Sequence, residues 1–324
     1  MSDSVADLIP EETLHGYDRL RADCGLLADA GVRILEIRGE DRKGWLQGQA
    51  TNDVKQLDVG ASYAFCLCSP TGQIVAVCDI WGLPERFIVT CDPISRDGLL
   101  QRVEQMVILE DVTARDITDE LVLLSVQGPN ATRGLSELLE LPTLDAAVDG
   151  ERTYLRSNRT GLGGWDVLLP KSEKKLIENI RKSFVEVDAH AYDIARLEAG
   201  IPRVGVDIDA KTMPPELGPV FEARHVSYKK GCYTGQEVLM RIHSRGHTNR
   251  TWVALFSREE LRAGDSVMFG KRGAVGTITS ATFSPDYGYI AAAMVRNEVV
   301  LEGETVLVNG HEAELRHMPI LRFD

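Results

Sequence analysis

Apolar residues follow two spacings along this chain, and these spacings predict where its helices and strands lie. Apolar positions three or four residues apart indicate amphipathic helices, whereas alternating or continuous β-branched and aromatic runs indicate strands. In chain order the first third is predicted to form a helix over 11–30, a strand over 32–39, a helix and its exit over 41–57, a hairpin over 62–83, a strand over 86–91 and a helix over 96–109.

A similar order of elements begins again near residue 120. The predicted elements are a strand, turn and helix over 120–139, a strand over 164–170, a helix over 172–184 and a helix over 192–200 that ends at Gly200. We therefore expect two related α+β halves, 1–117 and 118–245. From 246 to 324, short β-rich runs alternate with Gly, Asp and Asn turns, which predicts a small antiparallel barrel or sandwich.

The composition is that of an ordinary globular chain with an acidic balance. Its 324 residues are 44% hydrophobic and carry a net charge of −13, which disfavours general binding to DNA or to anionic membranes. Apolar runs stay well short of the ~18 residues of a membrane helix, and the acidic N-terminus lacks a signal pattern, so we expect a cytoplasmic protein. The six cysteines are expected to be free thiols in a reducing compartment.

Residues 224–250 reverse the acidic balance locally, with six Lys or Arg and one carboxylate, Glu237. This favours either an anion-binding face or a solvated loop. Cys232 lies within the stretch, where nearby positive charge favours a thiolate. His243 and His247 are spaced for a metal on a helix, but Gly246 argues against that helix and closed zinc sites prefer paired cysteines, so no metal site is expected.

Glu198 is a candidate ligand-binding carboxylate. It stands near the end of the helix that Gly200 terminates, where it is suited to accept hydrogen bonds from adjacent N–H donors such as the edge of a pterin ring. The alternative is that Glu198 binds no ligand and only lies at a helix terminus on the protein surface. Phosphate-binding, hydrolase and Rossmann motifs are not found in the sequence.

Six segments in one order resemble the YgfZ/GcvT folate-binding superfamily, which includes the glycine-cleavage T protein, an aminomethyltransferase, and the YgfZ-type proteins. They are DRKGWLQGQATNDV (41–54), SPTGQI (69–74), SVQGPNA (125–131), RTGLGGWDVLLP (159–170), ARLEAGIPRVGVD (195–207) and KGCYTGQE (230–237), the last resembling the YgfZ type. The resemblance implies a ring of three domains around a folate cleft: two partly interleaved α+β halves and a C-terminal β-barrel.

The resemblance also implies roles for particular residues. Glu198 would hold the pterin of tetrahydrofolate or of a one-carbon derivative. Asn130 and Arg224 would line the folate cleft, and Lys230 and Gln236 would also bind the folate. Cys232 would be a redox or thiolate contact to a cluster, or would only pack beside the cleft.

One position departs from the T proteins. The resemblance places their catalytic Asp, counted from Pro70-Thr71-Gly72, at Val77. Valine cannot move a proton, and the loss of a positioned acid or base costs ~10²–10⁴-fold in rate. Asp79 is on the same strand face, about 6–7 Å further along.

Three functions therefore remain open from the sequence. The first is a tetrahydrofolate-binding accessory protein for iron–sulfur cluster assembly or repair, with iron–sulfur enzymes, including tRNA-modifying ones, or assembly proteins as partners. The second is a tetrahydrofolate-dependent aminomethyltransferase or methyltransferase in which Asp79 or Glu237 acts as acid or base. The third is an interaction scaffold without folate, so enzymatic activity itself stays open.

Overall fold

The computed structural model describes residues 8–246 and 248–321 of the chain. In the first two thirds of the chain, one antiparallel and one mostly antiparallel sheet pack face to face. The five-stranded sheet has the order β3-β4-β5-β2-β6. Its strands are β2 (Arg33–Arg38), β3 (Ser62–Cys68), β4 (Ile74–Gly82), β5 (Phe87–Cys91) and β6 (Thr113–Asp116). Helices α3 (Arg42–Gln49) and α4 (Pro93–Met106) cover its outer face through one apolar core.

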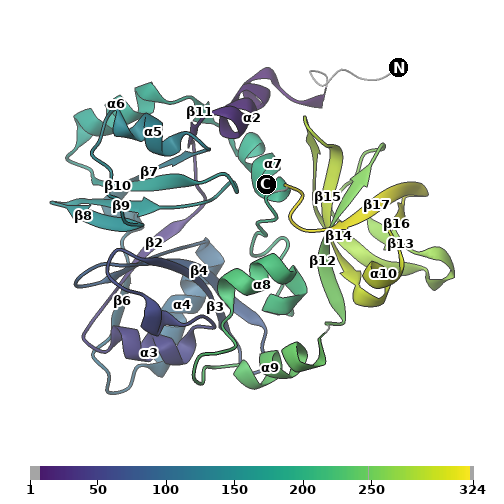
Figure 1. Ribbon diagram of the computed structural model, residues 1–324, viewed down its shortest axis with the longest axis horizontal. Coiled ribbons are helices and arrows are strands. Elements are labelled where there is room, and N and C mark those ends of the chain that lie inside the picture. The colour runs from purple at the N-terminus through teal and green to yellow at the C-terminus, as the bar shows by residue number, and fades with distance from the viewer. Residues whose placement is uncertain (1–7, 247, 322–324) are drawn as a thin grey trace.

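The six-stranded sheet has the order β11-β1-β7-β10-β9-β8, and only its β1–β11 pair is parallel. Its strands are β1 (Gly25–Leu27), β7 (Leu121–Gln127), β8 (Ala146–Asp149), β9 (Arg152–Arg156), β10 (Gly164–Pro170) and β11 (Glu186–Val187). Helices α5 (Ala131–Ser136) and α6 (Lys174–Ser183) pack on its outer face, so the four layers are helices, sheet, sheet and helices (Figure 1).

The third body is a closed antiparallel barrel of six strands, which confirms the α+β class with a C-terminal barrel and decides against a sandwich. Its elements are β12 (Arg250–Ser257), β13 (Ser266–Met268), β14 (Ala274–Ser284), β15 (Gly288–Arg296), α10 (Asn297–Glu302), β16 (Thr305–Val308) and β17 (His311–His317). Its interior is filled by small and branched apolar side chains.

Four helices connect these bodies (Figure 1). Helices α2 (Glu11–Ala22) and α7 (Ala189–Glu198) pack together, and α7 also contacts β14 of the barrel. Helix α8 (Pro219–His225) contacts β3, and α9 (Gln236–Arg245) precedes the barrel. A shared core that includes Cys66, Leu197, Phe221 and Trp252 joins the five-stranded sheet, α7, α8 and the barrel.

Several boundaries follow from local chemistry. Asp92 caps α4 by accepting hydrogen bonds from the N–H groups of Ile94 and Ser95, and Asp188 caps α7 through the N–H of Ala191. Gly200 lies just past α7 at φ 67°, as a residue that ends a helix in the left-handed region should. The predicted 62–83 hairpin is confirmed as β3 and β4.

The prediction of one helix over 11–30 is wrong beyond Ala22. Residues Gly25–Leu27 instead form β1, which pairs with β7 and β11. These partners lie far away in the chain, so local apolar spacing could not reveal the strand. Residues 11–27 thus lie with the six-stranded sheet, whereas the domain boundaries at 117/118 and 245/246 stay predictions. Across the described ranges, the helices are all too short or too polar to cross a membrane.

Candidate functional site

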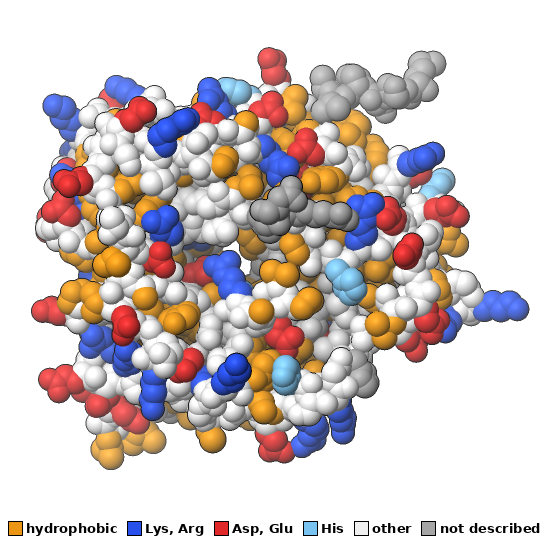
Figure 2. Space-filling model, viewed as in Figure 1, with side chains coloured by type: hydrophobic (Ala, Val, Ile, Leu, Met, Phe, Trp, Pro, Cys, Tyr) orange, Lys and Arg blue, Asp and Glu red, His pale blue; other side chains and the backbone are white. Residues whose placement is uncertain are grey.

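A pocket of about 560 Å³ opens where the two sheets meet α8. Strands β3 and β4 form one wall, and the turn after β7 and the β9–β10 connection form the other. Its lining residues are Ser62, Tyr63, Ala64, Asp79, Trp81, Gly128, Pro129, Thr132, Arg156, Ser157, Asn158, Leu162, Gly163, Gly164 and Arg224. Figure 2 shows this face hollowed near its middle, with acidic and basic side chains at the margin.

Asp79 and Arg224 come together in this pocket from elements 145 residues apart. Strand alternation puts Asp79 on the face of β4 that also carries Val77 and Trp81. The Arg224 guanidinium, in the last turn of α8, donates from Nη2 to Asp79 Oδ1 at 2.6 Å. The two side chains are 44% and 35% exposed, so this ion pair remains accessible to a ligand.

Val77 lies on β4 opposite Cys66, and its side chain packs against the shared core. Its backbone N–H donates to Ser95 Oγ of α4 at 2.9 Å, which fixes the strand at this point. Asp79, two residues on, is opposite Ala64 and Thr90. The carboxylate available on this face is therefore that of Asp79, displaced along the strand from position 77.

Glu198 lies outside the lining of this pocket, at the junction of α2, α7 and the β14–β15 hairpin. Its Oε1 accepts hydrogen bonds from Tyr17 Oη at 2.9 Å and from Ser284 Oγ at 2.6 Å. Its Oε2 has no hydrogen-bond donor within the described residues, and Arg21 Nη1 is 3.8 Å away. The side chain is 0% exposed, so one acceptor atom is buried without a donor, which is costly for a charged group.

Burial raises the pKa of Glu198 to about 7, although the hydrogen bonds from Ser284 and Tyr17 and the charge of Arg21 oppose this rise. Asp286 adds a second carboxylate, since Tyr17 Oη also lies 3.0 Å from its Oδ2. One hydroxyl proton thus faces two carboxylates. This arrangement gives Glu198 a proton equilibrium near neutral pH, as a ligand-responsive or acid–base group requires.

Lys230 has a different environment from the one expected of a folate contact. Its Nζ donates to the backbone carbonyls of Gln47 and Ala50 at 2.6 Å and of Asn52 at 3.0 Å. Burial lowers its pKa to about 8. All three ammonium protons thus bind the chain at the end of α3, where the helix leaves carbonyls unpaired.

After Lys230, residues 231–235 form a loop in which Tyr233 is buried, and helix α9 follows. Cys232 is exposed, and Gln236 begins α9, outside the pocket lining. Glu237 pairs with Arg241 at 2.7 Å on the helix surface, away from the pocket.

Helix α9 contains His243 and ends at Arg245, with Gly246 as its C-cap, so the expected break at Gly246 in a helix that would align His243 with His247 is confirmed. Gly235 and Gly246 bound it in left-handed conformations. His247 lies outside the described residues. No three His, Cys, Asp or Glu side chains among residues 8–246 and 248–321 are grouped to hold a metal.

Asn130 lies next to the pocket without lining it. It precedes α5, and its Nδ2 donates to Ala22 O at 3.4 Å, so its side chain is turned toward the end of α2. The neighbouring Gly128 and Pro129 do line the pocket.

Sequence reasoning missed Trp81 and the 156–158 segment. Trp81 Nε1 donates to Arg156 O at 3.0 Å, so the two pocket walls are joined. Residues 156–158 directly precede the Arg-Thr-Gly segment at 159, but only the packing of the two sheets shows that they face β4.

Comparisons with known proteins agree on one family. Residues 10–221 match the GCVT N-terminal domain. An aminomethyltransferase of Rubrobacter xylanophilus is 31% identical over 320 residues, covering 94% of this chain and 82% of the relative. An aminomethyltransferase of Listeria monocytogenes is 27% identical over 288 residues, covering 84% of this chain and 78% of the relative.

A solved structure shares the fold. The glycine cleavage system aminomethyltransferase T from Bartonella henselae superposes with a TM-score of 0.83 at 22% sequence identity, covering 97% of this chain and 91% of that one. The fold agrees over nearly the whole chain, and the sequence match extends through both sheets. The chain therefore belongs to the family of the GCVT N-terminal domain.

Proposed function

We propose that this protein binds tetrahydrofolate and acts as a folate-dependent aminomethyltransferase. The observation that carries the proposal is the buried Oε2 of Glu198, which lacks a donor within the described chain. A pterin ring presents adjacent N–H groups, which supply the donors that this acceptor lacks. When bound, tetrahydrofolate would supply the nitrogens that accept a one-carbon unit.

The chain's own groups would bind, orient and move protons. Glu198 would hold the pterin edge, with Tyr17 and Ser284 fixing its carboxylate. Arg224 would orient Asp79, whose carboxylate would act as the acid or base in place of a residue at position 77. The aminomethyltransferase names of the relatives support this reaction over other folate chemistry.

Titration with tetrahydrofolate tests whether the protein binds this ligand through Glu198. Glu198→Gln is expected to weaken binding by about 10- to 100-fold, since a charge-assisted hydrogen bond is lost. Isothermal calorimetry on the natural chain and the variant measures this. Glu178→Gln, at an exposed ion pair on α6, is the matched control and should bind like the natural chain. Equal binding by all three proteins, or none by the natural chain, would refute the Glu198 assignment.

Tetrahydrofolate-dependent release of ammonia from an aminomethyl carrier tests the reaction. In it the methylene carbon loses its bonds to the carrier and to the amino nitrogen and forms two bonds to folate nitrogens, while the two protons from those nitrogens pass to the carrier and to the departing ammonia. Asp79→Asn is expected to slow this release by ~10²–10⁴-fold, because the proton-transfer group is lost. Rates should be compared at saturating folate. Full activity of Asp79→Asn would exclude Asp79 as the acid or base.

A second candidate is an accessory role in iron–sulfur cluster assembly or repair. Two observations favour it: Val77 occupies the position implied for the transferase carboxylate, and Cys232 is exposed beside α9. A natural chain that binds tetrahydrofolate but releases no ammonia, together with lowered iron–sulfur enzyme activity in cells lacking the protein, would select this role. Normal activity of those enzymes would exclude it.

A further inference from the structure

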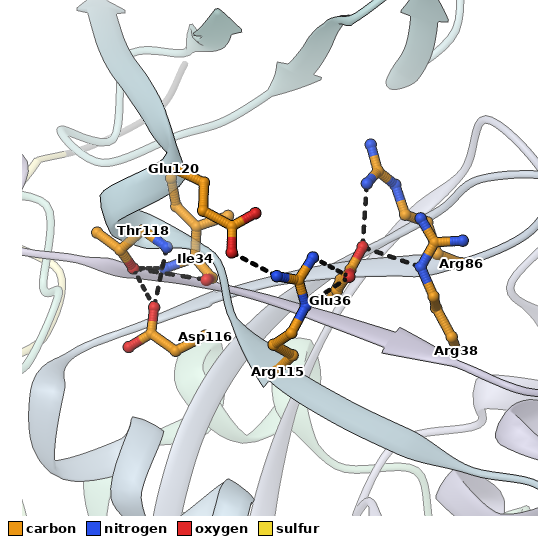
Figure 3. A network of polar contacts seen from close by, with 8 residues as sticks. All are labelled: Ile34, Glu36, Arg38, Arg86, Arg115, Asp116, Thr118 and Glu120. Carbon is orange, nitrogen blue, oxygen red and sulfur yellow. Dashed lines mark hydrogen bonds and ion pairs between the residues drawn. The ribbon is translucent and has the colours of Figure 1, made fainter. Parts of the chain in front are cut away.

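Three arginines converge on one buried carboxylate of the five-stranded sheet, on the strand next to its β6 edge (Figure 3). Glu36 of β2 is 3% exposed. Its partners are Arg38 of the same strand, Arg86 just before β5 and Arg115 of β6, with nitrogen–oxygen distances of 2.8–3.1 Å. These hydrogen bonds lower the pKa of Glu36 despite its burial, so the group is ionised at neutral pH.

The three arginines share this carboxylate unequally. Arg115 donates hydrogen bonds to Oε1 of Glu36 from both Nε and Nη2, and its Nη1 donates to Glu120. Arg38 Nε and Arg86 Nη1 both donate to the single atom Oε2, at 3.1 and 3.0 Å. The cluster thus holds three cations and two carboxylates, and its excess positive charge lies at Arg38 and Arg86.

Arg38 and Arg86 retain unused donors. Both Nη atoms of Arg38, and Nε and Nη2 of Arg86, have no hydrogen bond to any residue in the described ranges. The two side chains are 45% and 23% exposed, and they lie on the side of Glu36 away from Arg115 (Figure 3). Glu36 holds both guanidinium groups in place, so little ordering would accompany ligand binding.

We propose that Arg38 and Arg86 form a binding site for a small oxyanion, a phosphate or a carboxylate group. An oxyanion bridging the two guanidinium groups would accept paired hydrogen bonds and would reduce the repulsion between cations that share one oxygen. Neither arginine lines the pocket that contains Asp79, and neither is a hydrogen-bond or ion-pair partner of Glu198, so the site is separate from the proposed folate chemistry. The chain as a whole is acidic, and the attraction is therefore local to this cluster.

Calorimetric titration with inorganic phosphate at constant ionic strength tests this site. Arg38→Gln is expected to weaken phosphate binding at least about tenfold. Arg38→Lys keeps the charge but loses the forked donors, and should also bind more weakly than the natural chain. Arg262→Gln, at an exposed arginine paired with Glu260, is the control and should bind normally.

Circular dichroism of each variant checks that it folds. Arg86→Gln removes the other guanidinium group of the proposed site and serves as an independent second variant. Titrations with glycerol phosphate and with citrate then show whether phosphate or carboxylate groups are preferred. Equal phosphate affinity in the natural chain, Arg38→Gln and Arg38→Lys would overturn the proposal, as would no binding by the natural chain. Both the folate titration and the ammonia assay should be unchanged in Arg38→Gln, which separates this site from the proposed function.

Discussion

The variant Glu198→Gln is expected to match the stability of the natural chain below pH 4.5 and to exceed it by about 3 kcal/mol above pH 7. Burial raises the Glu198 pKa from its ordinary 4.5 to about 7, so between these values the folded state binds a proton that the unfolded state has released. The natural chain therefore loses stability as pH rises through this window. Glutamine does not ionise and avoids the loss.

Urea unfolding of both proteins across this pH range measures the effect. The groups that face Glu198 are Tyr17 and Arg21 of α2 and Asp286 of the β14–β15 turn, and they are unchanged in the variant. Glu178→Gln should follow the pH dependence of the natural chain. A stability difference between Glu198→Gln and the natural chain that does not change with pH would contradict a raised pKa.

This prediction separates stability from function at one residue. The same variant is expected to be more stable at neutral pH and to bind tetrahydrofolate more weakly. Binding sites commonly retain groups that destabilise the free protein, because the ligand later satisfies them. If Glu198 were only a structural carboxylate, removal of its charge would stabilise the protein without any effect on ligand affinity.

Arg196→Met is expected to lower the free energy of unfolding by about 3–5 kcal/mol. Arg196 is 1% exposed and donates to Asp207 at 2.6 Å, to Asp193 at 2.8 Å and to Ser280 Oγ of the barrel at 2.9 Å. Methionine fills similar volume but leaves the Asp207 carboxylate buried without its cation. Guanidinium-chloride unfolding followed by fluorescence measures the change.

The double variant Arg196→Met with Asp207→Leu tests whether the unpaired Asp207 carboxylate causes the loss of stability. Removing both charges should restore much of the stability, since a buried pair is often replaceable by apolar groups while half a pair is not. Arg262→Met, at an exposed arginine, should change stability little. If the single and double variants were equally unstable, the loss would come from packing and not from an unpaired charge.

Much of the local structure was predictable from the sequence. The 62–83 hairpin and the end of α7 at Gly200 depend on residues close together in the chain. Strand β1 was missed because its partners are distant, and Gly25 suits it since a Cβ there would lie 2.4 Å from a methyl carbon of Val187. Local apolar spacing carries no information on such contacts.

The candidate site was less predictable than the fold. Glu198 and Arg224 were identified as candidates, but the partners of Glu198, Tyr17 and Ser284, lie 181 and 86 residues away. Lys230 looked like a ligand contact because its neighbours are basic and glycine-rich. Its buried position against the end of α3 depends on carbonyl groups about 180 residues earlier in the chain.

The sequence by itself determined the α+β class, the C-terminal β-rich region and the lack of a carboxylate at position 77, since these depend on composition, periodicity and residue identity. Only the tertiary structure decided which charges are paired. It brought Arg224 to Asp79, buried Glu198 with one unpartnered oxygen, and gathered three arginines on Glu36. The physical reason is that ionisation and hydrogen bonding depend on burial and on contacts between distant segments.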